Sequence, residues 1–559
     1  MIPKISKIIL VLLLILLVFS VFKNIQYPII WGDEADTVMY AERILDYGYP
    51  KVHDGVNSLN YDMISGKVGV NEEYDVWTVT MWGQYYFTSV GARLARNVED
   101  IYTKTLLLRI PHGIVGLIGI LTIPFIVTPS IKSKDKKVYL WISYVFLTLF
   151  SVSLILHIQE VRSYALSIFF ASMFLNIFVR YKFYKSIGSV VYYVFGFIIL
   201  FLFANTFPPG YMSLIASIGV YVLISNFYYV KRNKKVFDWS KLIIDTTKDV
   251  LPIALSGVAM LPILRFFETS KVSQRAYIDM KFGWYIYSLY VTRVINFMFK
   301  YHFLGLFVFL IIALFAFEIV SKKISFKKSF LNIVQKEKVF TFLTFIFVLY
   351  IPVVAITPYM FDRYFVFLQP LLSLMISFGL ILVFERIRKI TPAGKRANST
   401  QIFSYALVLV FAVGLILNIE IYKGRIYELS NKYIGPMDYI VNYVQENFQD
   451  TQSLVIDTNI EQPVLMYYLG SQVICDDSPD CFSEPSDIII PRRGFLQDNF
   501  VQRVEGHMGR AEYEEVKLPI LDYPANNIPE LSLGLRHLFV TPVTENDSEK
   551  VILYVKKEE

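Results

Sequence analysis

Carboxylates stand in this chain where a membrane surface should begin. The first apolar run, residues 8–22, is followed by Trp31-Gly32-Asp33-Glu34-Ala35-Asp36. A carboxylate at bilayer depth costs about 2.5–3.5 kcal/mol even on forgiving insertion scales, so an acid near a span is set back from it or has a function there. An aspartate such as Asp33 can, when it is buried or paired, accept a hydroxyl proton as a general base. The alternative is that Asp33 and Glu34 belong to the solvated start of a helix.

Several polar residues flank later apolar runs and are predicted on the same side of the membrane as Asp33. They lie in Leu108-Arg109-Ile110-Pro111, in the 157–164 loop and in Asp362-Arg363-Tyr364. Each one alone could be a residue that snorkels to the interface. Together they suit a reaction on an anionic lipid headgroup, because arginine matches phosphate oxygens and stays charged under partial burial. The candidate binding residues are Arg109, His157, Glu160, Arg162, Tyr164, Arg363 and Tyr364.

The composition predicts a polytopic α-helical membrane protein. The 559 residues are 55% hydrophobic and 18% charged, whereas a soluble chain has about 25% charged residues. The net charge of +7 is unevenly distributed, since residues 420–559 hold about twenty-four acids and about twelve bases. The bases of the first part fall between apolar runs, where they set orientation. No soluble segment has a basic stripe with interleaved aromatic residues, so nucleic acid is not an expected partner.

Eleven apolar runs are the expected transmembrane helices. Lysine- and arginine-rich loops alternate with short loops that are nearly free of bases, and this predicts a cytoplasmic N-terminus, Asp33 outside and the C-terminal segment outside. Region 265–301 could hide a further span, which would move the C-terminal segment to the other side. The expected spans are 6–24, 106–128, 138–157, 165–180, 187–204, 211–230, 250–267, 302–320, 339–356, 365–384 and 402–419.

Two domains are predicted. Residues 1–420 form the transmembrane domain, with a long aromatic first external loop (24–105) expected to contain short helices on the membrane surface. Residues 421–559 form a small extracytoplasmic α/β domain, with strands expected near 453–456, 488–490, 537–540 and 551–555 and a helix at 462–469. No glycine-rich phosphate loop follows a strand there, so no nucleotide cofactor is expected.

The only two cysteines lie in this C-terminal domain. Cys475 and Cys481 are an even pair in a compartment predicted to be outside the cytoplasm, which favours a local disulfide, with two free thiols as the alternative. A divalent metal is a separate question. Asp33, His157 and Glu160 could form a hard or borderline site, but their spacing is not a metal signature.

The motifs jointly resemble a known family. The acid pair after the first span, Leu-Arg-Ile-Pro at 108–111, Gln-Glu-Val-Arg-Ser-Tyr at 159–164 and the later Arg363-Tyr364 with Pro370 resemble polyprenyl-phosphate-sugar glycosyltransferases of the GT-C fold. The most similar branch is the protein mannosyltransferase and aminoarabinose transferase group. One departure is that many relatives carry a Pro-Pro pair before the second span, and none stands between Asp33 and Arg109.

The resemblance implies an inverting transfer of a sugar from a polyprenyl phosphate to an acceptor on the outer face of the plasma membrane. Asp33 then matches the catalytic base, with Glu34 as its paired acid, and Glu160, Arg162 and Tyr164 match a loop that lines the site. Arg363 and Tyr364 match a loop that faces the lipid phosphate. The implied partners are the lipid-linked donor, membrane lipids and a lipid, protein or glycan acceptor.

Two other classes of function compete with this interpretation. A transporter or flippase of a lipid-linked or anionic solute would have polar groups or broken helices near the bilayer midplane, and often a repeat between its halves. Here the polar groups gather at one surface, and the number of spans is odd. A receptor that recognises glycans through its C-terminal domain would need no acid pair at Asp33.

Overall fold

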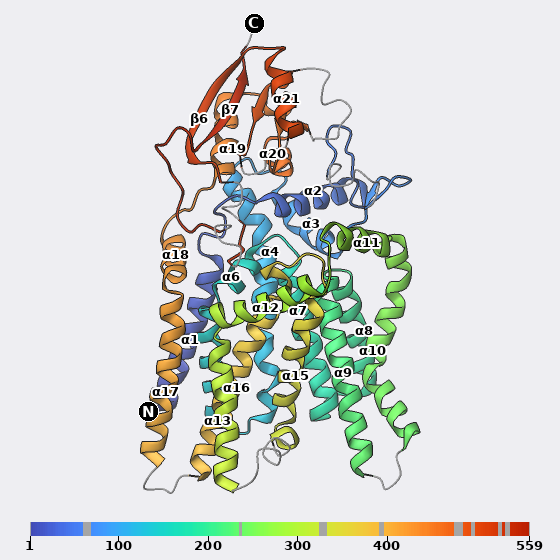
Figure 1. Cartoon of the computed structure of the whole chain (residues 1–559), viewed down its shortest axis with the longest axis vertical. Coiled ribbons are helices and arrows are strands. Elements are labelled where there is room, and N and C mark those ends of the chain that lie inside the picture. Colours follow the sequence, from blue (N-terminus) through green and yellow to red (C-terminus); the bar gives the residue numbers. More distant parts are fainter. Residues whose placement is uncertain are drawn as a thin grey trace.

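The computed structural model describes residues 2–59, 69–233, 238–322, 333–390, 396–474, 485–493, 498–523, 528–531 and 537–557. Long helices run side by side in a bundle, and a C-terminal domain with a β-sheet stands at one end of that bundle (Figure 1). Cys475 and Cys481 lie outside the described residues, and so does the predicted disulfide.

Apolar runs form the bundle because lipid offers the backbone no hydrogen-bond partners, so each run must satisfy its own N–H and C=O groups as a helix. All eleven predicted runs coincide with helices, and the chain is an integral membrane protein. The bundle helices are α1 (Ile2–Phe22), α4 (Ile101–Thr122), α5 (Lys134–Leu149), α6 (Val152–Gln159), α7 (Tyr164–Val179), α8 (Ser189–Ala204), α9 (Pro208–Asn233), α10 (Trp239–Phe266), α12 (Trp284–Tyr301), α13 (Leu304–Lys322), α15 (Lys338–Val354), α16 (Leu368–Ile390) and α17 (Arg396–Leu417).

The number of spans depends on how bent helices are counted. Within the described residues six helices can cross a membrane by length and composition, or up to nine if each of three bent pairs is one span. Helices α8 and α15 are apolar but shorter, so about eleven spans result only if these two also cross. Region 265–301 forms α11 (Thr269–Asp279) and α12, and neither helix meets the test alone.

Two bends shape the end of the bundle that carries the polar loops. Helices α5 and α6 meet at 76°, and α12 meets α13 at 87°. The sequence predicts one continuous span at 138–157, so the break between α5 and α6 is a correction. Residues Phe150 and Ser151 form the break, and the helix resumes as the short α6, which ends beside the predicted site loop.

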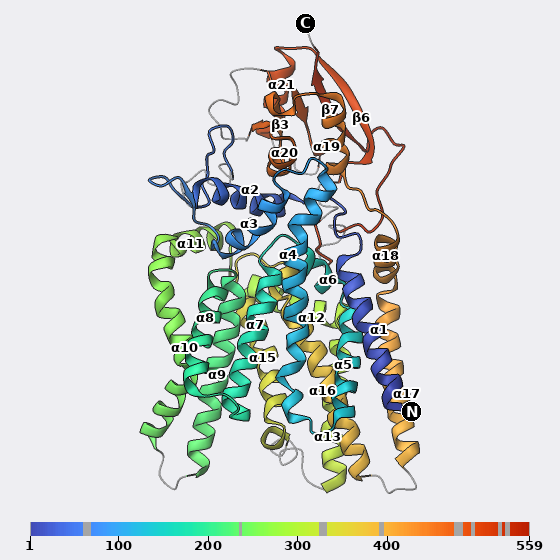
Figure 2. The ribbon, with the colours of Figure 1, turned by 180° about the vertical axis from the view of Figure 1, so that it is seen from behind.

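The first external loop contributes two helices that lie across this end of the bundle, α2 (Gly32–Tyr47) and α3 (Gly83–Ala95) (Figure 1). A two-stranded hairpin, β1 (Val70–Asn71) and β2 (Val76–Trp77), belongs to the same loop. From behind, α4 rises past the other bundle helices to the level of α2 and α20 (Figure 2). The predicted surface helices are therefore present.

Helix α4 packs closely against α7 through small residues. A Cβ added at Gly119 would lie 2.8 Å from the backbone nitrogen of Phe169, and one at Gly116 would lie 2.7 Å from Cβ of Ile158. Real Cβ atoms do not approach backbone this closely, so the two helices can touch here only because residue 119 has no side chain. This contact fixes where the loop between α6 and α7 meets α4.

The C-terminal domain contains a five-stranded mixed sheet in the order β4-β3-β5-β7-β6. The predicted strands at 453–456, 488–490 and 551–555 and the helix at 462–469 are all present, whereas residues 537–540 form no strand. The elements are α18 (Ile419–Ser430), α19 (Pro436–Asn447), β3 (Val455–Thr458), α20 (Gln462–Leu469), β4 (Gln472–Ile474), β5 (Ile488–Ile490), α21 (Asp498–Met508), β6 (Tyr513–Leu521) and β7 (Lys550–Lys556).

Buried side chains of this domain hold the loop before α2. Asp438 accepts a hydrogen bond from the amide of Ile29 at 3.2 Å, and the Tyr468 hydroxyl accepts one from the amide of Ile30 at 3.3 Å. The same hydroxyl lies 2.6 Å from Oγ1 of Thr105 on α4. The domain is thus packed onto the entrance of α2, although the predicted division at residue 420 stays a prediction.

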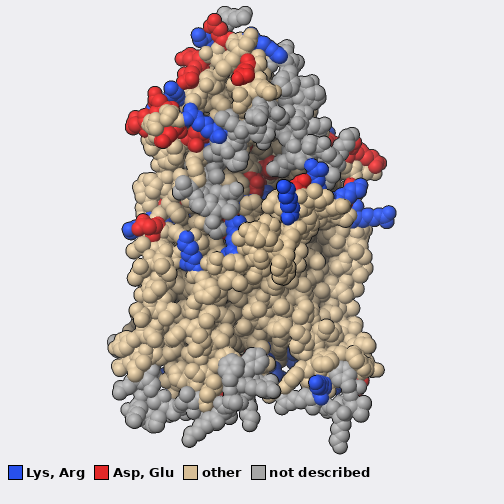
Figure 3. All heavy atoms as spheres, in the orientation of Figure 1, with Lys and Arg blue, Asp and Glu red and all other residues tan. Residues whose placement is uncertain are grey.

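Charged residues are unevenly distributed on the face drawn in Figure 3. Uncharged residues dominate the bundle, while acidic and basic residues gather over the C-terminal domain and along the rim below it (Figure 3). This pattern is expected of a chain whose bundle is embedded in lipid. Which side of the membrane carries the C-terminal domain stays a prediction from loop charge.

Candidate active site

Helix α2 begins at the site, and its first turn carries both candidate acids. Trp31 is the N-cap residue, and its amide donates to Oε2 of Glu34 at 3.3 Å. Neighbouring residues of a helix point about 100° apart, so only one of two adjacent acids can face the interior. Glu34 does so and is fully buried, while the Asp33 side chain keeps 32% of its surface exposed.

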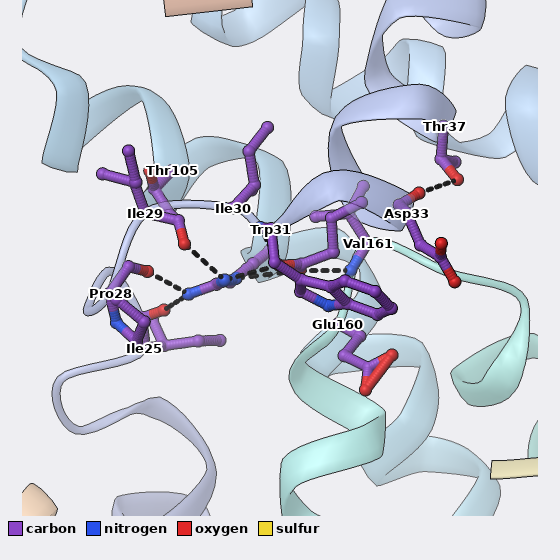
Figure 4. Close-up of polar contacts among 12 residues, drawn as sticks. Ile25, Pro28, Ile29, Ile30, Trp31, Asp33, Thr37, Thr105, Glu160 and Val161 are labelled. Atoms are coloured by element: carbon purple, nitrogen blue, oxygen red, sulfur yellow. Dashed lines mark hydrogen bonds and ion pairs between the residues drawn. The ribbon is translucent and has the colours of Figure 1, made fainter. Parts of the chain in front are cut away.

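Glu34 pairs with Arg109 in the buried interior. Arg109 donates from Nε to Oε1 at 3.0 Å and from Nη2 to Oε2 at 2.6 Å, and Oε1 also accepts from the amide of Val161 at 2.9 Å. The guanidinium further donates to the carbonyls of Ile25 and Pro28 at 2.9 and 2.7 Å. Figure 4 shows these carbonyls on the side of Trp31 away from Asp33. The pair therefore joins the pre-α2 loop, α4 and the α6–α7 loop.

Asp33 faces two arginines instead. Its Oδ2 lies 3.1 Å from Nη2 of Arg363 and 3.4 Å from Nη2 of Arg162. Arg162 also donates from Nη1 to the carbonyl of Asp33 at 2.9 Å and to Oγ1 of Thr37 at 3.0 Å. Burial is the largest single influence on Arg162 and disfavours its charge, but Asp33, Tyr164 and Tyr85 together raise the pKa of the guanidinium. Residues 33, 162 and 363, far apart in sequence, thus meet at one carboxylate.

The α6–α7 loop brings a second acid close by. Oε1 of Glu160 lies 2.9 Å from Nδ1 of His157, and both side chains are buried. Burial is the main cause that raises the pKa of Glu160 well above its ordinary value. Among the described residues, Oε2 of Glu160 and Nε2 of His157 have no hydrogen-bond partner. In Figure 4 the Glu160 carboxylate lies below the Trp31 ring.

Aromatic rings border the arginines. The Arg363 guanidinium lies 4.2 Å from the ring centre of Phe361 and 5.3 Å from that of Trp31. Tyr164 packs against His157 with ring centres 5.7 Å apart, and Tyr364 packs against Phe361 at 5.6 Å. Such rings hold a planar cation in place without neutralising it. They therefore leave the guanidinium charge available to an anion.

The C-terminal domain contributes side chains that the sequence analysis missed. Glu530 is fully buried, and its Oε1 lies 3.4 Å from Nε of Arg363. His537 lies beside Glu428, with Nε2 2.8 Å from Oε1. Glu530 belongs to an irregular segment with no periodic pattern, and His537 opens the predicted 537–540 strand, so the sequence offered no signal for either contact.

A small cavity of about 50 Å³ adjoins the site on the side of α1 and α18. Trp31, Glu34, Arg109 and Glu160 line it together with the tail residues Glu428 and His537. Its walls carry both acids and bases as well as an indole ring. Such a lining is polar, and the volume suits a few water molecules.

The candidate metal ligands are not arranged as a metal site in the part of the chain that the structure describes. No group of three or more His, Cys, Asp or Glu side chains there could hold a metal ion. His157 and Glu160 bind each other, and Asp33 binds the two arginines.

Comparisons with known proteins give a likeness to solved structures. No family model matches the chain, and no curated protein matches it. The chain is similar to the crystal structure of ArnT from Cupriavidus metallidurans bound to undecaprenyl phosphate, with 10% sequence identity and a TM-score of 0.48. The match covers 98% of this chain and 97% of that one. The function therefore has to be argued from the geometry of the site.

Proposed function

We propose that this protein is a membrane glycosyltransferase that transfers a sugar from a polyprenyl phosphate to an acceptor on the extracytoplasmic face. The observation that carries the proposal is a partly exposed carboxylate, Asp33, held between Arg162 and Arg363 at the polar end of an apolar bundle. A lipid-linked anionic donor needs such a place, where its chain lies in the membrane and its phosphate meets cations.

The two arginines supply the donor-binding part. Nη1 of Arg363 and Nε of Arg162 are buried without a hydrogen-bond partner among the described residues. A buried N–H without a partner costs about 1–3 kcal/mol, so these groups favour an incoming acceptor such as a phosphate oxygen. Guanidinium binds phosphate in a planar, charge-assisted geometry that lysine cannot reproduce.

Asp33 supplies the base in this proposal. The acceptor oxygen (or nitrogen) attacks the anomeric carbon, its proton passes to Asp33, and the bond from that carbon to the phosphate oxygen breaks with inversion. The electron pair leaves with the polyprenyl phosphate, whose charge Arg162 and Arg363 offset. No nucleotide sugar is required, because the donor already carries its leaving group.

Glu34 and Arg109 have a different role from the one that the sequence suggests. The charges of Glu34 and Arg109 offset each other, and their remaining hydrogen bonds go to backbone groups. The pair thereby joins three segments around Asp33. We therefore propose that Glu34 and Arg109 are positioning residues. Glu160, His157 and Tyr164 border the donor side, with the unpartnered Oε2 of Glu160 suited to a sugar hydroxyl.

The test is to incubate purified protein with a panel of polyprenyl-phosphate sugars and to measure released polyprenyl phosphate. Wild-type protein should release it only with an acceptor present, and Asp33→Asn should lower release by about a hundredfold or more. Asp46→Asn is the matched control, because Asp46 lies on the same helix in an exposed ion pair with Arg96. Movement of an intact lipid-linked sugar across vesicles without release would instead favour a flippase.

A further inference from the structure

A short tail segment, residues 528–531, enters the site from the C-terminal domain. Glu530 is fully buried, and its Oε2 accepts a hydrogen bond from the amide of Asp362 at 2.8 Å. The carbonyl of Leu531 accepts from the Tyr301 hydroxyl on α12 at 3.3 Å. The segment is therefore anchored through the Glu530 carboxylate and through the residue after it, 168 residues beyond the loop that it contacts.

Glu530 determines which edge of Arg363 remains available. Asp33 lies 3.1 Å from Nη2, and Glu530 lies 3.4 Å from Nε. Nη1 of the same guanidinium is buried and has no hydrogen-bond partner in the described residues. Acids beside Nη2 and Nε orient the planar guanidinium, the Nε contact being an ion pair without a hydrogen bond, and Nη1 is the nitrogen that can meet a ligand.

We propose that Glu530 is a positioning residue that holds Arg363 with its free Nη1 toward the donor phosphate, and that its negative charge competes with that phosphate for the guanidinium. The proposal rests on the proposed function, since it assumes that Arg363 binds a phosphate. It gives the C-terminal domain a direct part in donor binding through a single carboxylate.

The charges around Glu530 predict the sign of a pH effect. Burial, followed by Asp362, raises the pKa of Glu530 to about 7, while Arg363 and His157 oppose this rise. Asp33 and Arg293 also face this cluster, Arg293 with Nη2 3.7 Å from Oδ1 of Asp362. A phosphate bound to Arg363 adds a negative charge and favours protonated Glu530. Binding therefore takes up a proton and weakens as the pH rises.

The experiment measures binding of undecaprenyl methyl phosphate to the full-length protein in detergent at pH 6, 7 and 8. This phosphodiester keeps one charge throughout the range, so any change reflects the protein. If bound phosphate raises the pKa of Glu530 by about one further unit, the wild-type affinity falls about fivefold from pH 6 to pH 8.

Glu530→Gln keeps the size of the side chain and an oxygen for the Asp362 amide but removes the charge. Its affinity at pH 8 should equal its affinity at pH 6, whereas Glu530→Asp should retain the pH dependence. Asp457→Asn is the control, because Asp457 is a buried tail carboxylate whose Oδ2 lies 3.3 Å from Nε2 of His507. It should bind like the wild type at every pH.

Each result decides between the two proposals. A wild-type protein that binds the probe equally at all three pH values overturns the role of Glu530, even if Glu530→Gln does not fold. The same holds if Glu530→Gln binds with the wild-type pH dependence. In both cases the glycosyltransferase proposal stands. A wild-type protein that binds no probe at any pH overturns both proposals.

Discussion

Amide substitutions at the neighbouring acids Asp33 and Glu34 should affect different properties: turnover at Asp33 and the stability of the fold at Glu34. Glu34 is fully buried and accepts hydrogen bonds from two nitrogens of Arg109 and from the amides of Trp31 and Val161. Glu34→Gln would leave the Arg109 guanidinium buried without a counter-charge. Removing one partner of a buried ion pair costs about 3–5 kcal/mol.

The carbonyls of the pre-α2 loop reduce this cost. Arg109 still donates to Ile25, Pro28 and Ile29 in the variant, so we expect the lower limit, about 3 kcal/mol. Asp33 is partly exposed, and in its amide variant Arg363 keeps Glu530 while Arg162 keeps the Asp33 carbonyl and Thr37, so the cost should be well below that at Glu34. Asp33→Asn should therefore unfold closer to the wild type than Glu34→Gln does, but lose about a hundredfold to ten-thousandfold in turnover, the usual contribution of a general base.

Thermal unfolding in detergent, followed by tryptophan fluorescence, and release of polyprenyl phosphate measure the two effects separately. Asp46→Asn on the same helix should change neither quantity. A Glu34→Gln protein with the wild-type unfolding midpoint would refute the assignment of Glu34 to a structural pair. A fully active Asp33→Asn protein would remove the proposed base.

Three further substitutions test the donor site, the tail contacts and the packing. Arg363→Gln should weaken binding of undecaprenyl methyl phosphate about tenfold to a hundredfold, the value of a charged hydrogen bond, while Arg96→Gln on the exposed face of α3 should bind normally. Burial raises the pKa of Asp438 from 3.8 to about 7, so its stabilising contribution is present below pH 4 and is lost as the pH rises through 7. Over this pH range the free energy of unfolding of the wild type should fall by up to about 4 kcal/mol relative to that of Asp438→Asn. Two plots of this free energy against pH that stay parallel would contradict the prediction. Gly119→Ala should lower the unfolding midpoint, because its Cβ meets the Phe169 backbone. Gly257→Ala on α10 should leave the midpoint unchanged, because its Cβ would have no atom within 4 Å. Equal midpoints for the two variants would show that α4 and α7 have room to move.

Local patterns predicted the elements well where one periodicity dominates. The helix at Gln462–Leu469 forms at the predicted residues, because an apolar run follows Glu461 and ends at Gly470, whose left-handed φ of 70° suits glycine. The apolar runs became bundle helices for the same reason. The bend at Phe150 and Ser151 was missed, since both residues are compatible with a continuous helix.

The site was predictable only in part, for a geometric reason. Charge and position indicated Asp33, Arg162 and Arg363, and the structure brings these three together, although their roles stay a prediction. The sequence could not tell that Glu34 faces inward to Arg109, because adjacent helical residues differ only by rotation. Glu530 gave no signal either, since the segment Ile528-Pro529-Glu530-Leu531 has no periodicity and its partner is 168 residues away. The predicted strand at 537–540 is wrong, because those residues cross the end of α18 and His537 contacts Glu428 there.

The hydrogen bond from the amide of Ile29 to Asp438 spans 409 residues, which has a consequence for biosynthesis. While a ribosome makes this chain, the segment leading into α2 is inserted early, but its buried partners emerge only with the last quarter of the polypeptide. An unfinished product therefore lacks the tail contacts of the segment before α2, which the Glu34–Arg109 pair then joins to α4. The proposed transfer activity therefore requires the tail, and a chain that ends before Asp438 should lack it.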